Sequence, residues 1–282
     1  MLRKHAGLLP AALLLGGLFG FALVVTVLYS FWRVADFDVR ADWTLGNYEY
    51  LLSVGTYART FAATLVMVAT ATLLSIGAAF PFAYWLARHV APAWQRPLLL
   101  AVVLPFFASY LLRIYAWIAI LGQNGLINRA LQAIGLTDQP VSLFLFNRPA
   151  VVLVLVYLYF PFAVLALYVA LERFDWAQLG AAMDLGATPW GAMRRVMLPQ
   201  IRPGLATAVV FVAIPMVGEY VTPLLVGGTK GVMAGNLVAT FFDTGEYSRG
   251  AAAALLIAAF VTAALVYFRR SLDVAAAVDA AQ

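Results

Sequence analysis

The chain contains no cysteine among its 282 residues, which excludes disulfide bonds and thiolate metal sites. Histidine is nearly absent as well. The two present, His5 and His89, each lie beside basic residues, and a metal site needs several converging donors. We therefore interpret both as polar residues at the level of the lipid headgroups. Charged residues are also scarce, at 11% of the chain against about 25% in soluble domains.

What the chain has in quantity is apolar residues, which make up 64% of it. A helix needs about 20 predominantly apolar residues to cross the hydrocarbon core of a lipid bilayer. The sequence predicts an all-α integral membrane protein, with residues 1–282 forming one domain of six transmembrane helices. The first apolar run exceeds the roughly 7–15 residues of a signal peptide, so we expect it to be retained. The predicted spans are residues 8–31, 60–87, 98–121, 149–171, 204–227 and 249–268.

An even number of spans puts both termini on one side of the membrane. Short segments rich in Arg and Lys favour the cytoplasm, and such segments begin and end the chain. Arg3 and Lys4 precede the first span, and Arg269 and Arg270 follow the last, so both termini are predicted to be cytoplasmic. The net charge of +5 does not indicate nucleic acid binding, because this insertion rule alone produces positive loops.

The connections between spans have local helix signals of their own. On the outer side, short helices are expected at 126–134 and within 44–57. On the cytoplasmic side, the connection 172–203 opens with Asp175 and Gln178, which form an N-terminal capping pattern. Gly186 is typical of the position just after a helix end. The sequence therefore predicts a short helix that begins at Asp175 and stops at Gly186.

A second short helix is predicted directly after the first. Thr188 is a favoured N-cap, and Pro189 suits the first helical position, where its missing N–H would be unpaired anyway. We expect this helix to carry Arg194 and Arg195 and to end before Pro199. One interpretation of the whole loop is an amphipathic connector on the membrane surface. The other is a docking element, in which small residues allow close approach of a partner.

Two charged residues lie well inside predicted spans, away from the span ends. Glu219 is the only acidic one, and Arg113 lies at a similar depth in the third span. Ionisable residues in hydrocarbon usually face the bundle interior or a water-filled cavity. Two compatible interpretations stay open: an Arg113–Glu219 structural pair, or a carboxylate that attracts a cationic solute. Pro215 and Pro223 flank Glu219 and predict a kink, which suits a cavity wall, a gate or a fixed bend.

Aromatic side chains share helical faces near these charges. Tyr110 and Trp117 lie on the same face of the third span as Arg113, and Tyr157 begins a similar stripe on the fourth. Rings beside a carboxylate can hold an ammonium group by cation–π attraction, although such stripes are more often ordinary packing. The candidate pathway residues are Glu219, Tyr220, Arg113, Tyr110, Trp117 and Tyr157.

The sequence carries no recognisable catalytic motif. The segment 227–231, Gly-Gly-Thr-Lys-Gly, lacks the first glycine of a phosphate-binding loop and the Ser or Thr that follows its lysine. A serine nucleophile elbow, a metal-ligand cluster and a paired-carboxylate site are also missing. We therefore do not expect the chain to be an enzyme or to hydrolyse ATP by itself.

The predicted cytoplasmic loop carries a spaced motif. It consists of Gly180, Ala181 and Ala182, three residues, Gly186, nine residues, and then Val196, Leu198 and Pro199. This motif resembles the EAA loop of binding-protein-dependent ABC permeases, whose pattern is Glu-Ala-Ala, three residues, Gly, nine residues, then Ile-x-Leu-Pro. The spacing matches throughout, but a glycine replaces the Glu and a valine replaces the Ile. The first change removes a charge that, in the family, helps to engage the ATPase.

Further short patterns occur in order along the chain. They are Leu104-Pro105, Arg113 with Tyr115 to Trp117, Gly125 to Asn128, Pro161-Phe162, Leu171 to Arg173, and Gly218 to Pro223 with Gly227-Gly228. Together they resemble the spermidine/putrescine branch of that family. The resemblance implies a type I ABC importer permease in the lipid of a bacterial inner membrane. It also implies a second permease subunit, two ATP-binding subunits and an external solute-binding protein. No cofactor is expected in this chain, and ATP and Mg²⁺ belong to the ATPase partner.

The implied solute is a small cation of the spermidine/putrescine type, or another amino-containing solute. An alternative from a different class is a secondary transporter that uses Glu219 as a proton relay. Against it, the sequence shows neither the inverted repeats nor the paired broken helices typical of such transporters. The implied ATPase-coupling residues are Gly180, Ala181, Ala182, Asp184, Leu185, Gly186, Ala187, Thr188 and Pro189.

Overall fold

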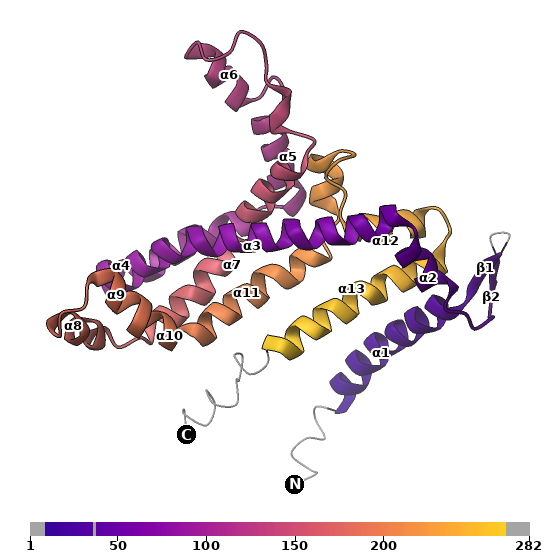
Figure 1. Cartoon of the computed structure of the whole chain (residues 1–282), viewed down its shortest axis with the longest axis horizontal. Coiled ribbons are helices and arrows are strands. Elements are labelled where there is room, and N and C mark those ends of the chain that lie inside the picture. Colours follow the sequence, from indigo (N-terminus) through magenta and orange to yellow (C-terminus); the bar gives the residue numbers. More distant parts are fainter. Residues whose placement is uncertain (1–8, 36–37, 269–282) are drawn as a thin grey trace.

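The computed structural model describes residues 9–35 and 38–268, and within them the chain is almost entirely helical (Figure 1). The basic residues that predict cytoplasmic termini lie outside the described residues, so that orientation stays a prediction. They are Arg3, Lys4, Arg269 and Arg270.

Three helices form the main bundle. These are α3 (Gly55–His89), α7 (Arg148–Glu172) and α11 (Arg202–Val217), which all pack against one another. Beside them, α1 (Leu9–Phe31) and α13 (Tyr247–Phe268) lie antiparallel, with the start of α1 and the end of α13 at the same end of the pair (Figure 1). Large apolar side chains on α1, such as Phe19 and Phe21, are exposed, as a lipid-facing helix requires.

The connecting segments match the sequence in part. The expected outer helices are confirmed as α2 (Gly46–Ser53) and α6 (Leu126–Ala133). Three further elements were not predicted. They are the antiparallel hairpin of β1 (Arg33–Ala35) and β2 (Asp38–Arg40), the short turn η4 (Ser142–Phe144), and α12 (Ala234–Asp243).

The predicted span 98–121 is not one helix. It consists of α4 (Pro92–Val103), the tight turn η3 (Leu104–Phe107) and α5 (Tyr110–Leu121), with a bend of 89° after Phe107. Pro105 has no N–H to continue the helical ladder, and Ala108 and Ser109 adopt extended backbone with ψ of 150° and 134°. As a result, α5 and α6 extend away from the main bundle (Figure 1).

The predicted span 204–227 is broken as well, because α11 ends at Val217 and a widened turn, η6 (Pro223–Gly227), follows. By length and composition, α3, α7 and α13 are each able to cross a membrane. Counting each sharply bent helix pair as one span raises the number in the described chain to five at most. The count of six therefore remains a prediction.

Small residues let the bundle helices approach closely. On α3, Ala71, Ala79 and Ala83 are fully buried in the main core. On α11, a Cβ at Gly204 would overlap the Cβ of Ala170 on α7. Van der Waals packing between close backbones is the main attraction between helices in lipid, where the hydrophobic effect gives none. These positions therefore hold the scaffold on which the functional residues are placed.

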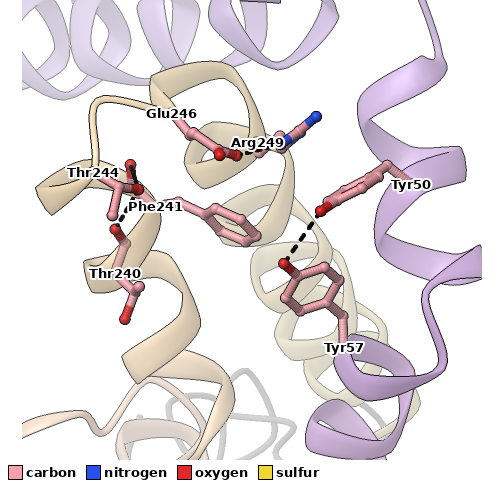
Figure 2. Close-up of polar contacts among 7 residues, drawn as sticks. All are labelled: Tyr50, Tyr57, Thr240, Phe241, Thr244, Glu246 and Arg249. Atoms are coloured by element: carbon pink, nitrogen blue, oxygen red, sulfur yellow. Dashed lines mark hydrogen bonds and ion pairs between the residues drawn. The ribbon is translucent and has the colours of Figure 1, made fainter.

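A cluster joins four helices at the end of the bundle where α2 meets α3 and α12 meets α13 (Figure 2). Tyr50 of α2 shares a hydrogen bond of 3.4 Å with Tyr57 of α3, and Phe241 of α12 packs on the Tyr57 ring. Arg249 of α13 lies over the Tyr50 ring at 3.9 Å and pairs with Glu246. Because this ion pair is about one-third exposed, packing contributes more here than charge.

Candidate functional site

Glu219 lies in the break between α11 and η6. Its N–H reaches back to the carbonyl of Met216 at 3.2 Å, after which the helix stops. The proline four positions later, Pro223, has no N–H to donate to the Glu219 carbonyl, and its ring would collide with that carbonyl in a regular helix. Pro223 thus prevents a regular helix through Glu219, and a position inside a predicted span lies in an irregular segment.

Helix α12 supports this irregular backbone. Gly235 lies against it so closely that a Cβ there would approach the Glu219 carbonyl oxygen to 2.6 Å. Asn236 donates from Nδ2 to the Tyr220 carbonyl at 2.7 Å and accepts from the Met233 N–H at 2.9 Å. Irregular backbone is tolerated at membrane depth only where protein or water satisfies its polar groups. Sequence reasoning missed both Gly235 and Asn236, because α12 itself was not expected.

The Glu219 carboxylate is buried and hydrogen-bonded on both oxygens, with 9% of the residue exposed. Tyr110 donates to Oε1 at 2.7 Å, and the N–H groups of Val221 and Thr222 approach the same oxygen at 3.2 and 3.4 Å. Tyr159 donates to Oε2 at 3.2 Å. Two phenols from α5 and α7 therefore converge on one carboxylate in the break.

Tyr159 is the site residue that the sequence did not identify. The aromatic stripe on α7 pointed to Tyr157, which is 37% exposed and instead packs edge-on against Trp117 at 5.4 Å between ring centres. Two residues along a helix turn the side chain by about 200°, so Tyr157 and Tyr159 face different ways. The sequence did contain a signal for this residue, because Tyr159 lies only two positions after Tyr157.

Arg113 does not pair with Glu219. Among the side chains that the structure describes, the only salt bridge joins Arg249 and Glu246. The Arg113 guanidinium lies over the rings of Phe106 at 4.8 Å and Tyr110 at 5.8 Å, and its buried Nε has no hydrogen-bond partner. The interpretation of a direct Arg113–Glu219 pair is therefore wrong for this structure.

The candidate pathway residues thus divide into groups. Tyr110, Arg113 and Glu219 lie together around the two helix breaks, while Trp117 and Tyr157 form a separate stacked pair. Tyr220 is 48% exposed, and its contact in the site is through its backbone carbonyl.

The first half of the cytoplasmic loop forms as predicted. Helix α8 (Trp176–Asp184) is capped by Asp175, whose side chain accepts from the Ala177 N–H at 3.0 Å. Gly186 has a φ of +90°, and the backbone bonds Gly186 N–H to Met183 and Ala187 N–H to Ala182 close the helix in a Schellman arrangement. Gln178 does not complete a capping box, because its side chain accepts from Gln200 instead.

The second half differs from the prediction at its end. Thr188 caps α9 (Pro189–Ala192) by accepting from the Gly191 N–H at 3.1 Å. The helix does not end before Pro199: it widens into a π turn, η5 (Met193–Met197), and continues as α10 (Leu198–Gln200). The wide turn, closed by the Leu198 N–H and the Met193 carbonyl, accommodates a proline that cannot donate. The chain then bends by 71° into α11.

The loop has a buried side and an exposed side. Leu179 and Met197 are buried in the main core, which fixes the loop to the bundle. Leu185 is 90% exposed and Trp190 is 64% exposed, so the corner presents apolar side chains outward. A Cβ added at Gly180 would meet no atom within 4 Å, so a side chain can begin at this position without displacing a neighbour.

Comparison with known proteins decides the family. The family described as "Binding-protein-dependent transport system inner membrane component" matches residues 79–275. The chain belongs to this family. It is 34% identical over 236 residues to the spermidine/putrescine transport system permease protein PotB of Escherichia coli, covering 83% of this chain and 84% of PotB. It is also 34% identical over 246 residues to the inner membrane ABC transporter permease protein YdcU of the same organism, covering 80% and 77% respectively.

Solved structures support the same fold. One chain of a bacterial alginate ABC transporter, crystallised with an alginate pentasaccharide-bound periplasmic protein, has a TM-score of 0.76 and covers 96% of this chain and 95% of its own. The sequence identity is 16%, so this likeness bears on the fold alone. The chain is an inner-membrane component of an ABC transport system and has an ABC permease fold.

The family also resolves the alternative from a different class. The structure contains two broken helices, so the expectation that broken helices are absent is wrong, and it cannot count against a secondary transporter. Family membership favours the ABC permease over that alternative. A permease is a transport component rather than an enzyme.

Proposed function

We propose that this chain is a permease subunit of an ABC importer that carries a small cationic solute of the polyamine class. The similarity to PotB, whose name specifies spermidine and putrescine, supports the solute class. In this proposal the chain works with a second permease subunit, two ATP-binding subunits and an external solute-binding protein. ATP and Mg²⁺ are bound by the ATP-binding subunits.

The observation that carries the proposal is the Glu219 carboxylate at the helix break. A buried charge in a membrane helix is costly and marks a solute pathway more often than ordinary packing. The surrounding rings of Tyr110, Tyr159, Phe106 and Phe162 suit a positively charged ligand, because aromatic faces attract cations. Arg113 already makes such contacts with Phe106 and Tyr110.

The cytoplasmic loop supplies the route for ATP-driven motion in this proposal. The exposed corner at Leu185 and Gly186, with Trp190 beside it, is the surface that we assign to the ATPase. Nucleotide-dependent movement of the ATPase would shift the loop and bias the bundle between two arrangements. Since Gly180 carries no charge, contact here depends on apolar packing and on the small residues around Gly180.

Transport in proteoliposomes tests the proposal. The chain, reconstituted with its partner subunits, should take up labelled spermidine only when ATP is inside the vesicles. Glu219→Gln should weaken uptake by about tenfold or more, because a hydrogen bond between two charged groups contributes about 1.5–3 kcal/mol. Uptake driven by a proton gradient without ATP would contradict the importer assignment.

A matched control separates the charge of Glu219 from a general effect of removing a carboxylate. Glu172 also accepts a hydrogen bond from a tyrosine, Tyr168 at 3.3 Å, but it is exposed at the cytoplasmic end of α7. Glu172→Gln should leave spermidine uptake near the wild-type rate. An equal loss of spermidine uptake in both variants would contradict a specific role for Glu219.

A further inference from the structure

The two oxygens of the Glu219 carboxylate have different surroundings. Oε1 accepts from the Tyr110 hydroxyl at 2.7 Å and is approached by the backbone N–H groups of Val221 and Thr222. Oε2 accepts from the Tyr159 hydroxyl alone, at 3.2 Å. A carboxylate offers about four lone-pair positions, two on each oxygen. Oε1 therefore has a donor for every lone pair, whereas one lone pair of Oε2 has no donor among the described residues.

Tyr110 cannot act as a second donor to a ligand while it holds Glu219. Its hydroxyl hydrogen points to Oε1, so the contact of 2.8 Å with Thr222 Oγ1 has Thr222 as the donor. Tyr110 is also the first residue of α5, directly after the 89° bend. Its bond to Glu219 thus joins the two helix breaks and fixes the orientation of the carboxylate.

The side on which Oε2 lies is lined by rings. Tyr159, which touches Oε2, packs against Phe162 at 6.0 Å between ring centres, and Phe162 packs edge-on against Phe106 at 5.0 Å. Phe106 in turn carries the Arg113 guanidinium on its face at 4.8 Å. A row of aromatic rings therefore runs from the Tyr159 hydroxyl at Oε2 to the Arg113 guanidinium, and aromatic rings of this kind also attract alkylammonium groups.

We propose that Oε2 of Glu219 is the acceptor for one ammonium group of the solute, and that Tyr110 is the positioning residue that holds the carboxylate through Oε1. Tyr159 is a competitor in this arrangement, since its hydroxyl occupies part of Oε2 and must yield or share it. The inference rests on the proposed function and adds the geometry of its cation site.

Equilibrium binding of labelled spermidine tests the inference, with the permease and ATP-binding subunits assembled in lipid nanodiscs without the solute-binding protein. Tyr110→Phe should weaken binding by about fivefold to tenfold, because the carboxylate loses its anchor. Tyr159→Phe removes one hydroxyl from the same carboxylate but should tighten binding by up to about fivefold, because the competitor is gone. Equal losses in the two variants, or a larger loss in Tyr159→Phe, would overturn the proposal.

A double substitution distinguishes positioning from a merely structural effect. If Tyr110 acts through Glu219, then Tyr110→Phe should have no further effect on binding in a Glu219→Gln background, and an additive loss would contradict this. Thr222→Val removes the hydroxyl that contacts Tyr110 but keeps the backbone N–H. It should weaken spermidine binding by about twofold to threefold. Unaltered binding would contradict the role of Tyr110 as the residue that holds the carboxylate. Unaltered binding in Glu219→Gln alone would refute the role of Glu219 in the proposed function. If Glu219→Gln loses binding but Tyr110→Phe and Tyr159→Phe lose it equally, only this inference would be refuted.

Discussion

Helix α11 approaches α7 closely at Gly204, and we therefore expect Gly204→Ala to lower the free energy of unfolding. A Cβ at this position would overlap the Cβ of Ala170, so Gly204→Ala must push the two helices apart or distort them. Overpacking of this kind costs about 1–3 kcal/mol. Alanine gains up to about 1 kcal/mol over glycine in a helix, but less here because Gly204 lies in the first turn of α11. The expected net loss is about 1–2 kcal/mol.

The assay is thermal unfolding in detergent, followed by the fluorescence of the seven tryptophans. A loss of this size should lower the midpoint by about 2–8 °C. Gly77→Ala is the matched control, because Gly77 is also helical but a Cβ there meets no atom within 4 Å, so its midpoint should be equal or higher. Combining Gly204→Ala with Ala170→Gly should restore most of the loss. Equal midpoints for Gly204→Ala and Gly77→Ala would refute the packing described here.

Three further predictions concern the loop and the helix break. Gly180→Glu should increase ATPase activity coupled to transport, since a Cβ there meets no atom within 4 Å and the new side chain restores the charge of the family motif. If activity does not rise, apolar contact alone is sufficient to couple the loop to the ATPase. Leu185→Ser should reduce copurification of the ATPase subunit, while Leu136→Ser in the outer loop, where the side chain is 67% exposed, should leave it unaltered. Asn236→Ala should lower the unfolding midpoint, because it leaves the Tyr220 carbonyl unpaired at a cost of about 1–3 kcal/mol.

Signals confined to a few neighbouring residues predicted the structure well. Four of the six spans correspond to single helices, because a long apolar run leaves little choice of structure in lipid. The caps at Asp175, Gly186 and Thr188 were also correct, since each depends on one side chain or one backbone angle. The same reasoning placed Tyr110 and Glu219 in the candidate site, from their types and their place in the spans.

Features that depend on contacts between distant segments were not predictable in this way. Pro223 predicted a kink, but its local signal does not distinguish a kink from a complete break, and the break after Pro105 was not predicted. The outcome at Glu219 depends on Gly235 and Asn236, which support the freed backbone from α12. The choice of Tyr159 over Tyr157 likewise depends on where α5 and η6 lie relative to α7. At Pro199, the helix continues because the π turn before it accommodates the missing N–H of the proline.

The two candidate functional surfaces lie at opposite ends of one helix. α11 has 16 residues and is therefore about 24 Å long. At its start, the 71° bend after Gln200 joins it to the loop that we assign to the ATPase, and Met197 anchors that loop in the core. Just beyond its other end is Glu219, joined to α5 by Tyr110. We therefore expect a displacement of the loop along or about α11 to act on the Tyr110–Glu219 bond, and this bond connects the only two breaks that interrupt predicted spans in the described chain.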